Sequence, residues 1–80
     1  MRLDQYLSKV GLIKRRTVAK EMADSGLIKK NGERCKPAGE VNEGDIISVG
    51  GSHPLTIKIT ALPAGNVKKE ERENYYQSMA

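Results

Sequence analysis

Tryptophan and phenylalanine are absent from this chain of 80 residues, which contains only three tyrosines, one cysteine and one histidine. A single cysteine excludes an internal disulfide. Cys35 and His53 together offer too few soft ligands for a zinc site made by the protein alone. The core must therefore consist mainly of small aliphatic side chains, and we expect neither a metal nor another cofactor.

Long hydrophobic runs are also missing. No apolar segment approaches the roughly 18 residues that a membrane span needs. The first residues, Met1-Arg2-Leu3-Asp4, lack the apolar core of a signal peptide. We therefore expect one small domain, located in the cytoplasm, with no membrane partner.

Charge is distributed unevenly along the chain. Residues 1–36 contain 10 Lys or Arg against 4 Asp or Glu, whereas residues 37–80 contain 4 against 6, which gives the net charge of +4. A surplus of this kind often serves only solubility. Its concentration in one half of the chain favours a polyanionic partner instead.

The first 26 residues are typical of two short helices that end at glycines. Apolar residues at helical spacing predict one helix over residues 2–10, ended by Gly11. A second helix is predicted over residues 15–24, ended by Ser25-Gly26. Its apolar side is predicted to contain Val18, Ala19, Met22 and Ala23.

The following residues are typical of short strands. The Asn31-Gly32 dipeptide predicts a hairpin over residues 27–36. Residues 46–49 and 55–60 predict two further strands. The fold class is therefore α+β, with two short N-terminal helices packed on a small, mainly antiparallel sheet. We predict a domain at residues 1–62 and a tail at 63–80, which forms a marginal helix or is disordered when free.

Catalytic chemistry has little support. Cys35 and His53 could form a nucleophile and a base, but one lies in a hairpin strand and the other in a glycine-rich loop, where nothing orients them. The carboxylates Asp4, Asp24 and Asp45 show no partner in the sequence. We therefore expect a protein that is not an enzyme.

Binding chemistry is better represented, because arginine's planar fork matches phosphate geometry and neutralised phosphates release counterions. Arg16 and Lys20 lie one turn apart on the second helix. Tyr6 faces the core, so base stacking is disfavoured, and shape-and-phosphate recognition of structured RNA fits better. The basic residues of the helix pair and hairpin that could serve are Arg2, Lys14, Arg15, Arg16, Lys20, Lys29, Lys30 and Lys36.

Several short motifs follow one another over residues 1–60: Arg2-Leu3-Asp4, Leu7, Arg16, Ala19-Lys20, Gly26-Leu27-Ile28, Asn31-Gly32, Lys36-Pro37 and Gly44-Asp45-Ile46. In this order and spacing they resemble the S4-type RNA-binding domain family, which implies the S4-like (αL) fold. The resemblance carries over Arg2, Arg16 and Lys20 as RNA-binding residues. It implies flanking phosphate contacts by Lys14, Arg15, Lys29, Lys30, Asn31 and Lys36. Many members have Ser or Thr where Arg15 stands, so either Arg15 contacts RNA or the helix cap comes from elsewhere.

Two stand-alone branches of this family are most similar. Arg34-Cys35-Lys36-Pro37 is similar to the heat-shock branch, which binds dissociated large ribosomal subunits. The chain length, residues 12–17 and Lys68-Lys69-Glu70-Glu71 with Tyr76 look more like the P-site tRNA-stabilising branch of bacterial ribosome quality control. The long basic C-terminal extension of the heat-shock branch is absent.

This second similarity implies partners. They are the ribosomal RNA of the large subunit, P-site peptidyl-tRNA and a factor that adds alanine tails to stalled nascent chains. It implies a ribosome-associated protein, which we expect to be a monomer. Two alternatives are an RNA-binding appendage of an RNA-modifying enzyme, for which the chain leaves no catalytic domain, and a DNA-binding helix-turn-helix, whose usual third helix is replaced by the hairpin.

Overall fold

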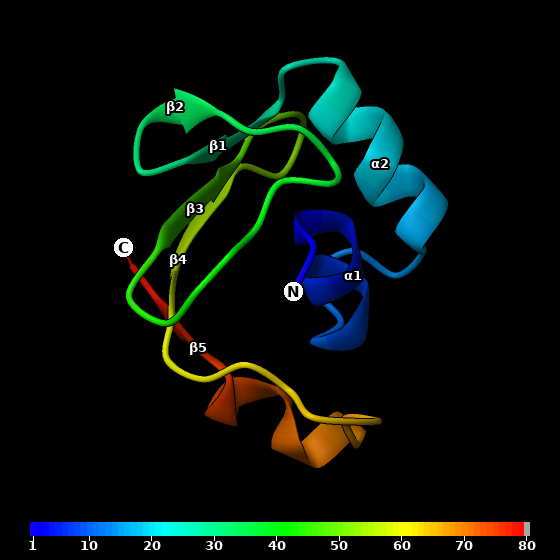
Figure 1. The fold of residues 1–80 in the computed structure, drawn as a ribbon, viewed down its shortest axis with the longest axis vertical. Coiled ribbons are helices and arrows are strands. Elements are labelled where there is room, and N and C mark those ends of the chain that lie inside the picture. Colours follow the sequence, from blue (N-terminus) through cyan, green and yellow to red (C-terminus); the bar gives the residue numbers. More distant parts are fainter. Residues whose placement is uncertain (80) are drawn as a thin grey trace.

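The computed structural model describes residues 1–79 and shows two short helices beside a five-stranded antiparallel sheet (Figure 1). The helices are α1 (Leu3–Lys9) and α2 (Arg16–Asp24). The strands lie in the order β2-β1-β3-β4-β5. Their bounds are β1 Ile28–Lys30, β2 Glu33–Arg34, β3 Ile46–Val49, β4 Leu55–Ile59 and β5 Tyr76–Ser78. A 3-10 helix, η1 (Lys69–Asn74), precedes the last strand. The predicted α+β class is confirmed.

Local turn chemistry places the elements where the sequence predicts them. Gly11 and Gly26, which follow the two helices, have φ of 76° and 79°, a conformation in which a Cβ is unfavourable. Asn31 and Gly32 have φ of 53° and 85°, as a two-residue hairpin turn between twisted strands requires. The turn sets Lys30 opposite Glu33 in the register of β1 and β2.

The core lies between α1, α2 and one face of the sheet. Side chains of β3 and β4 point alternately to the two faces of the sheet, and those on the inner face, Ile47, Val49, Ile57 and Ile59, are buried. Leu3, Tyr6 and Leu7 of α1 are fully buried, as is Val10, which directly follows the helix. The core is aliphatic apart from Tyr6 and Cys35, as the composition predicts.

The predicted apolar side of α2 is wrong at one residue. Ala19 and Ala23 are buried and Met22 is partly buried, but Val18 is 40% exposed. The two alanines are one turn apart on a single face, and their small side chains let α2 approach the core closely. Val18 lies at the edge of this contact and remains in solvent.

The tail adds a strand that the sequence does not predict. Residues 76–78 form β5, which pairs with the edge of β4 in the register Ile57↔Ser78 and Ile59↔Tyr76. Backbone groups of an exposed edge strand need partners, and β5 supplies them. The predicted marginal helix is present as η1. The boundary between domain and tail at residue 62 stays a prediction. The pairing of β5 with β4 does not favour it, because a strand of the tail joins the sheet of the predicted domain. Residue 80 lies outside the described residues.

The hydroxyl of Tyr6 ties the tail to α1 by donating a 2.7 Å hydrogen bond to the backbone oxygen of Tyr75. Burial, together with nearby Tyr76, raises the pKa of Tyr6 well above its ordinary value. The unfolded chain loses the Tyr6 proton near pH 10, whereas the folded chain keeps it. The free energy of unfolding must therefore fall as the pH rises above about 10.

We expect Tyr6→Phe to lower the free energy of unfolding by about 1 kcal/mol at pH 7, because the Tyr75 carbonyl loses its donor. The variant must also show a shallower decline in stability above about pH 10, measured by urea unfolding at a series of pH values. The two proteins differ only at residue 6, so the difference between their slopes reports on Tyr6. Equal slopes would contradict this role of the hydroxyl.

None of the helices formed by residues 1–79 is long and apolar enough to cross a membrane.

Candidate nucleic-acid interface

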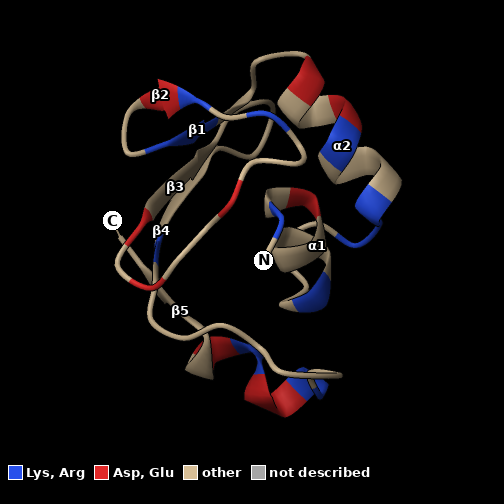
Figure 2. Ribbon diagram, in the orientation of Figure 1, with Lys and Arg blue, Asp and Glu red and all other residues tan. Residues whose placement is uncertain are grey.

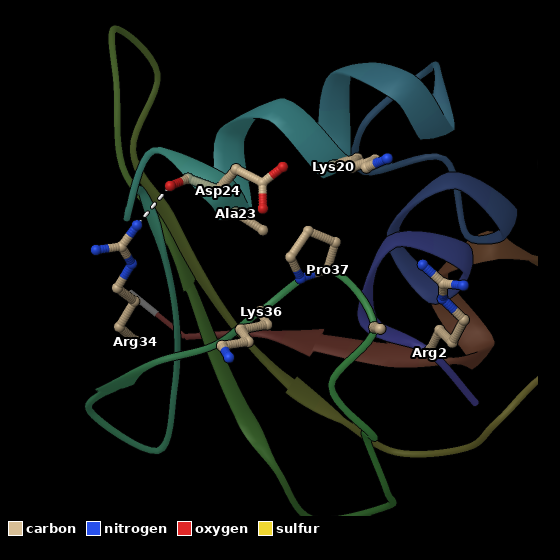
Figure 3. A pocket seen from close by; sticks show the side chains of 8 residues that line it. Arg2, Lys20, Ala23, Asp24, Arg34, Lys36 and Pro37 are labelled. Atoms are coloured by element: carbon tan, nitrogen blue, oxygen red, sulfur yellow. Dashed lines mark hydrogen bonds between the residues drawn. The ribbon is translucent and has the colours of Figure 1, made fainter.

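A groove of about 720 Å³ lies between α2, the start of α1 and the segment after β2 (Figure 3). Buried Ala23 and Pro37 form apolar parts of its wall. Four of its lining residues are cations, and Asp24 is the one acid among them. The complete lining is Arg2, Lys20, Ala23, Asp24, Arg34, Lys36, Pro37 and Ala38.

Backbone pairing brings the N-terminus of the chain to this groove. The amide of Leu3 donates to the Gly39 oxygen at 2.8 Å, and the amide of Asp4 donates to the Pro37 oxygen at 3.1 Å. These carbonyls satisfy two of the free N–H groups at the start of α1, where Arg2 provides no side-chain cap. A bridge between Arg2 and Glu40 extends the pairing. Arg2 is thereby fixed beside Lys36 and Pro37, which are more than 30 positions away in the sequence.

A buried carboxylate, that of Asp4, pairs with two arginines, of which Arg2 lines the groove. Asp4 is only 2% exposed. It accepts two hydrogen bonds from Arg2, Nε–Oδ1 at 3.2 Å and Nη2–Oδ2 at 3.1 Å. The Arg16 Nε atom lies 3.5 Å from the Asp4 Oδ2 atom. The sequence shows no partner for Asp4, and the fold supplies two.

This arrangement, the Arg2–Asp4–Arg16 triad, joins the start of α1 to the start of α2. Bidentate contact holds the planar guanidinium of Arg2 in one orientation. The arginine side chains are 47% and 48% exposed, so solvent screens the pairing and both keep donors for a further anion. The first turn of α1 also favours a negative charge at Asp4. The triad therefore presents two oriented guanidinium groups toward solvent.

Arg34 is a groove residue that the sequence analysis missed. Its guanidinium donates to the backbone oxygen of Asp24 at the end of α2, where free carbonyls and the helix dipole favour a cation. It also packs against Gly26, where an added Cβ would lie 3.3 Å from the Arg34 Nε atom. The sequence could have indicated this role only if the return of the hairpin toward the end of α2 had been predicted.

The start of α2 is uncapped and cationic. Arg15 occupies the N-cap position, and no side-chain cap is formed within the described residues. Lys14, Arg15 and Arg16 are all exposed there, beside the free N–H groups of the first turn. The missing cap expected from the sequence is confirmed. Lys14 lines a different cleft, together with Arg72 of the tail.

Arg15→Ser is expected to move stability and RNA binding in opposite directions. A serine cap accepts an N–H of the first turn and removes a cation from the positive end of the helix dipole, which adds about 1 kcal/mol to the free energy of unfolding. Loss of a phosphate contact weakens RNA binding by about 1 kcal/mol and lowers its salt dependence. Thermal melting and RNA titration measure the two effects. RNA affinity that is unchanged would show that Arg15 does not contact RNA.

Of the hairpin residues predicted as RNA contacts, Lys36 lines the groove, whereas Lys29 and Lys30 are not brought to it. Lys29 pairs in register with Ser48, so its side chain is on the sheet face opposite Ile28 and the core. Lys30 donates to the Glu40 oxygen at 2.8 Å. The hairpin tip points away from α2 (Figure 1).

Asn31 uses both ends of its amide within the protein. Its Nδ2 atom donates to Asp45 Oδ1 at 3.1 Å, and its Oδ1 atom accepts from the Ile46 amide at 2.9 Å. These bonds anchor the turn to the start of β3. The contact of Asn31 with RNA stays a prediction, and its structural role is the one that its geometry supports.

Residues considered for catalysis are not arranged for it. Cys35 is buried, and burial raises the pKa of its thiol, so the neutral form is favoured over the nucleophilic thiolate. His53 is exposed in the loop before β4. Within residues 1–79, no three His, Cys, Asp or Glu side chains are grouped to hold a metal ion.

Figure 2 shows basic residues on α2 and the segment before it, at the start of α1 and in the hairpin, with acidic residues among them on α2, α1 and β2. The combination of oriented arginines, flanking lysines and an open groove suits a phosphate backbone. The described part of the chain exposes few aromatic rings, since Tyr6 is fully buried and Tyr75 and Tyr76 are partly buried. Stacking on bases is therefore a poor match to this surface.

Comparison with known proteins places these features in a family. The model of the S4 domain matches residues 1–47. A protein of Bacillus subtilis (strain 168), named RQC P-site tRNA stabilizing factor, is 44% identical over 95% of this chain and 88% of its own length. Proteins of the same name are 47% identical in Listeria monocytogenes, over 95% of this chain and 83% of theirs, and 40% identical in Streptococcus pneumoniae, over 96% and 88%.

Solved structures share the fold over the whole chain. Heat Shock Protein 15 of Vibrio cholerae, described as trimeric, superposes with a TM-score of 0.91 at 30% identity and covers 100% of this chain and 82% of that one. The solution structure of the hypothetical protein HP1423 gives a TM-score of 0.84 at 34% identity, over 100% and 98% of the two chains.

Proposed function

Because this chain belongs to the S4 domain family, we propose that it is an RNA-binding, ribosome-associated factor that stabilises tRNA in the P site. Relatives of 40–47% identity that carry this name align with nearly the whole chain. The observation that carries the proposal is the Arg2–Asp4–Arg16 triad beside the cationic groove. It supplies oriented, half-exposed guanidinium groups, and among residues 1–79 the carboxylate of Asp4 is the only acidic group that pairs with them.

The geometry favours recognition of RNA by its backbone and shape. Arg2 and Arg16 contact phosphates, and Lys20, Lys36 and Arg34 extend the same cationic surface along the groove. Such contacts fix the position of a structured RNA without reading its bases. The protein then acts as a binding factor and not as an enzyme.

The proposed binding partner is a large ribosomal subunit that still carries peptidyl-tRNA after a stalled ribosome has split. The protein contacts ribosomal RNA and tRNA together, works in the cytoplasm as a monomer, and supports alanine tailing of the nascent chain by a partner factor. Holding the tRNA in place raises the fraction of particles on which that partner can act.

The similarity to Heat Shock Protein 15 favours a second candidate, a factor that recycles stalled large subunits. The two functions differ in what happens to the tRNA. A P-site stabilising factor slows the loss of peptidyl-tRNA from purified large subunits, whereas a recycling factor does not. Measuring tRNA retention with and without the protein separates them.

The test of the proposed function is co-sedimentation with large subunits that carry peptidyl-tRNA, using the unaltered chain and Arg16→Ala. We expect the variant to bind about 1–3 kcal/mol more weakly, because one charge-assisted contact is lost. Its melting temperature should change little, since Arg16 is half-exposed and Arg2 still pairs with Asp4. Lys58→Ala is the control, because Lys58 is exposed on β4 outside the groove lining. Failure of the unaltered chain to co-sediment would overturn the proposal.

A further inference from the structure

A second cationic cleft, of about 350 Å³, lies between the end of α1 and the tail. Its lining is Ser8, Gly11, Lys14, Lys69 and Arg72. It shares no residue with the groove described above. The tail runs close to the end of α1 (Figures 1 and 2), and Lys9 donates to the Gly65 oxygen at 3.4 Å.

The positive charge of this cleft is not neutralised within the described residues. Lys14, Lys69 and Arg72 make no ion pair with any acidic side chain of residues 1–79. The Nε atom of Arg72 is buried and has no hydrogen-bond partner there. The three glutamates of η1 are not among the lining residues. A buried guanidinium Nε atom without a partner is unusual, since such groups are costly to leave unpaired.

Gly11 leaves room for the Arg72 guanidinium. A Cβ at Gly11 would lie 2.6 Å from both Cζ and Nε of Arg72, so a larger residue there would displace the end of this side chain. Gly11 also has a φ of 76°, which the end of α1 requires. The backbone at the end of α1 therefore forms the surface on which the tail places its arginine.

We propose that this cleft binds a backbone phosphate of the RNA held by the groove, so that the tail is part of the RNA-binding surface. The inference rests on the proposed function for the identity of the ligand. Lys14 lies two positions before Arg16 of the triad, and both are exposed. One RNA backbone can therefore follow the exposed side chains of Lys14, Arg15 and Arg16, from the groove into the cleft.

The test compares Lys69→Gln with Lys68→Gln in the full chain. The two lysines are neighbours, both are exposed, and only Lys69 lines the cleft. Binding to large subunits carrying peptidyl-tRNA is measured at several salt concentrations. We expect Lys69→Gln to bind about fivefold more weakly, with the slope of log K against log salt reduced by about one. Lys68→Gln should match the unaltered chain.

Lys14→Gln and the double variant with Lys69→Gln show whether one anion is shared. Lys14 and Lys69 come from distant parts of the sequence. If both contact the same phosphate, the loss of RNA affinity in the double variant is smaller than the product of the two single losses. Equal binding by Lys69→Gln and Lys68→Gln, or fully multiplicative effects of Lys14→Gln and Lys69→Gln, would overturn the shared phosphate site. Binding that is lost in Arg16→Ala but equal in Lys68→Gln and Lys69→Gln refutes the cleft alone and leaves the proposed function standing.

Discussion

Replacing both Arg2 and Arg16 with alanine is expected to weaken RNA binding by about 4 kcal/mol, close to a thousandfold in Kd. Each arginine contributes a charge-assisted contact with phosphate, and the two are oriented by the same carboxylate. The double variant also leaves Asp4, which is 2% exposed, without a cation. We expect this to lower the free energy of unfolding by about 2 kcal/mol, since a buried charge without its partners is costly.

A third substitution separates the two effects. Adding Asp4→Asn to the double variant removes the uncompensated charge, while an amide oxygen can still accept the Gln5 N–H that Asp4 accepts at 2.7 Å. Stability should then recover, and RNA binding should not. Urea unfolding and RNA titration are compared across the three proteins. Recovery of binding together with stability would mean that the arginines support the fold and do not contact RNA.

Much of the fold follows from local patterns. Glycines at positions 11 and 26 and the Asn31-Gly32 turn act through backbone conformations that few other residues adopt. Alternation in β3 and β4 needs only one buried sheet face. Such signals operate over a few residues, so the sequence alone predicts them well.

Contacts between distant residues are less accessible to sequence reasoning. The pairing of Asp4 with Arg16 depends on how α1 and α2 pack. The strand β5 is three residues long, too short for a pattern, and forms because β4 offers a free edge. Arg34 reaches the groove only because the hairpin turns back toward the end of α2.

Counting basic residues in a segment also does not show which face they share. Lys29 and Lys36 belong to the same predicted hairpin, yet Lys36 lines the groove and Lys29 lies on the outer face of the sheet. Lys29 lies within β1, whereas Lys36 follows the end of β2, so a cluster in the sequence is divided in space. Around the hairpin, fewer basic residues line the groove than the sequence predicts, because Lys29 and Lys30 lie outside it. Toward the tail, Lys69 and Arg72 line a cationic cleft that the sequence does not predict.

Asn31→Asp is expected to lower the free energy of unfolding by about 2 kcal/mol at pH 7. The substitution keeps the size of the side chain, and aspartate also tolerates the positive φ at this position. It replaces the donor that faces Asp45 Oδ1 at 3.1 Å with a second carboxylate oxygen, so an attraction becomes a repulsion. Like charges at this distance raise the pKa of one of the two carboxyl groups in the folded variant.

The sign of the pH dependence follows from that raised pKa. The unfolded variant releases the proton near pH 4, whereas the folded variant holds it to a higher pH. The variant therefore loses stability as the pH rises above about 4 and regains it on acidification, relative to the unaltered chain. Combining Asn31→Asp with Asp45→Asn restores one donor and one acceptor between the two positions, and stability at pH 7 should return. If Asn31 instead acts through RNA, the double variant recovers stability at pH 7 and still binds RNA more weakly, a result that would assign to this residue the contact that its family resemblance implies.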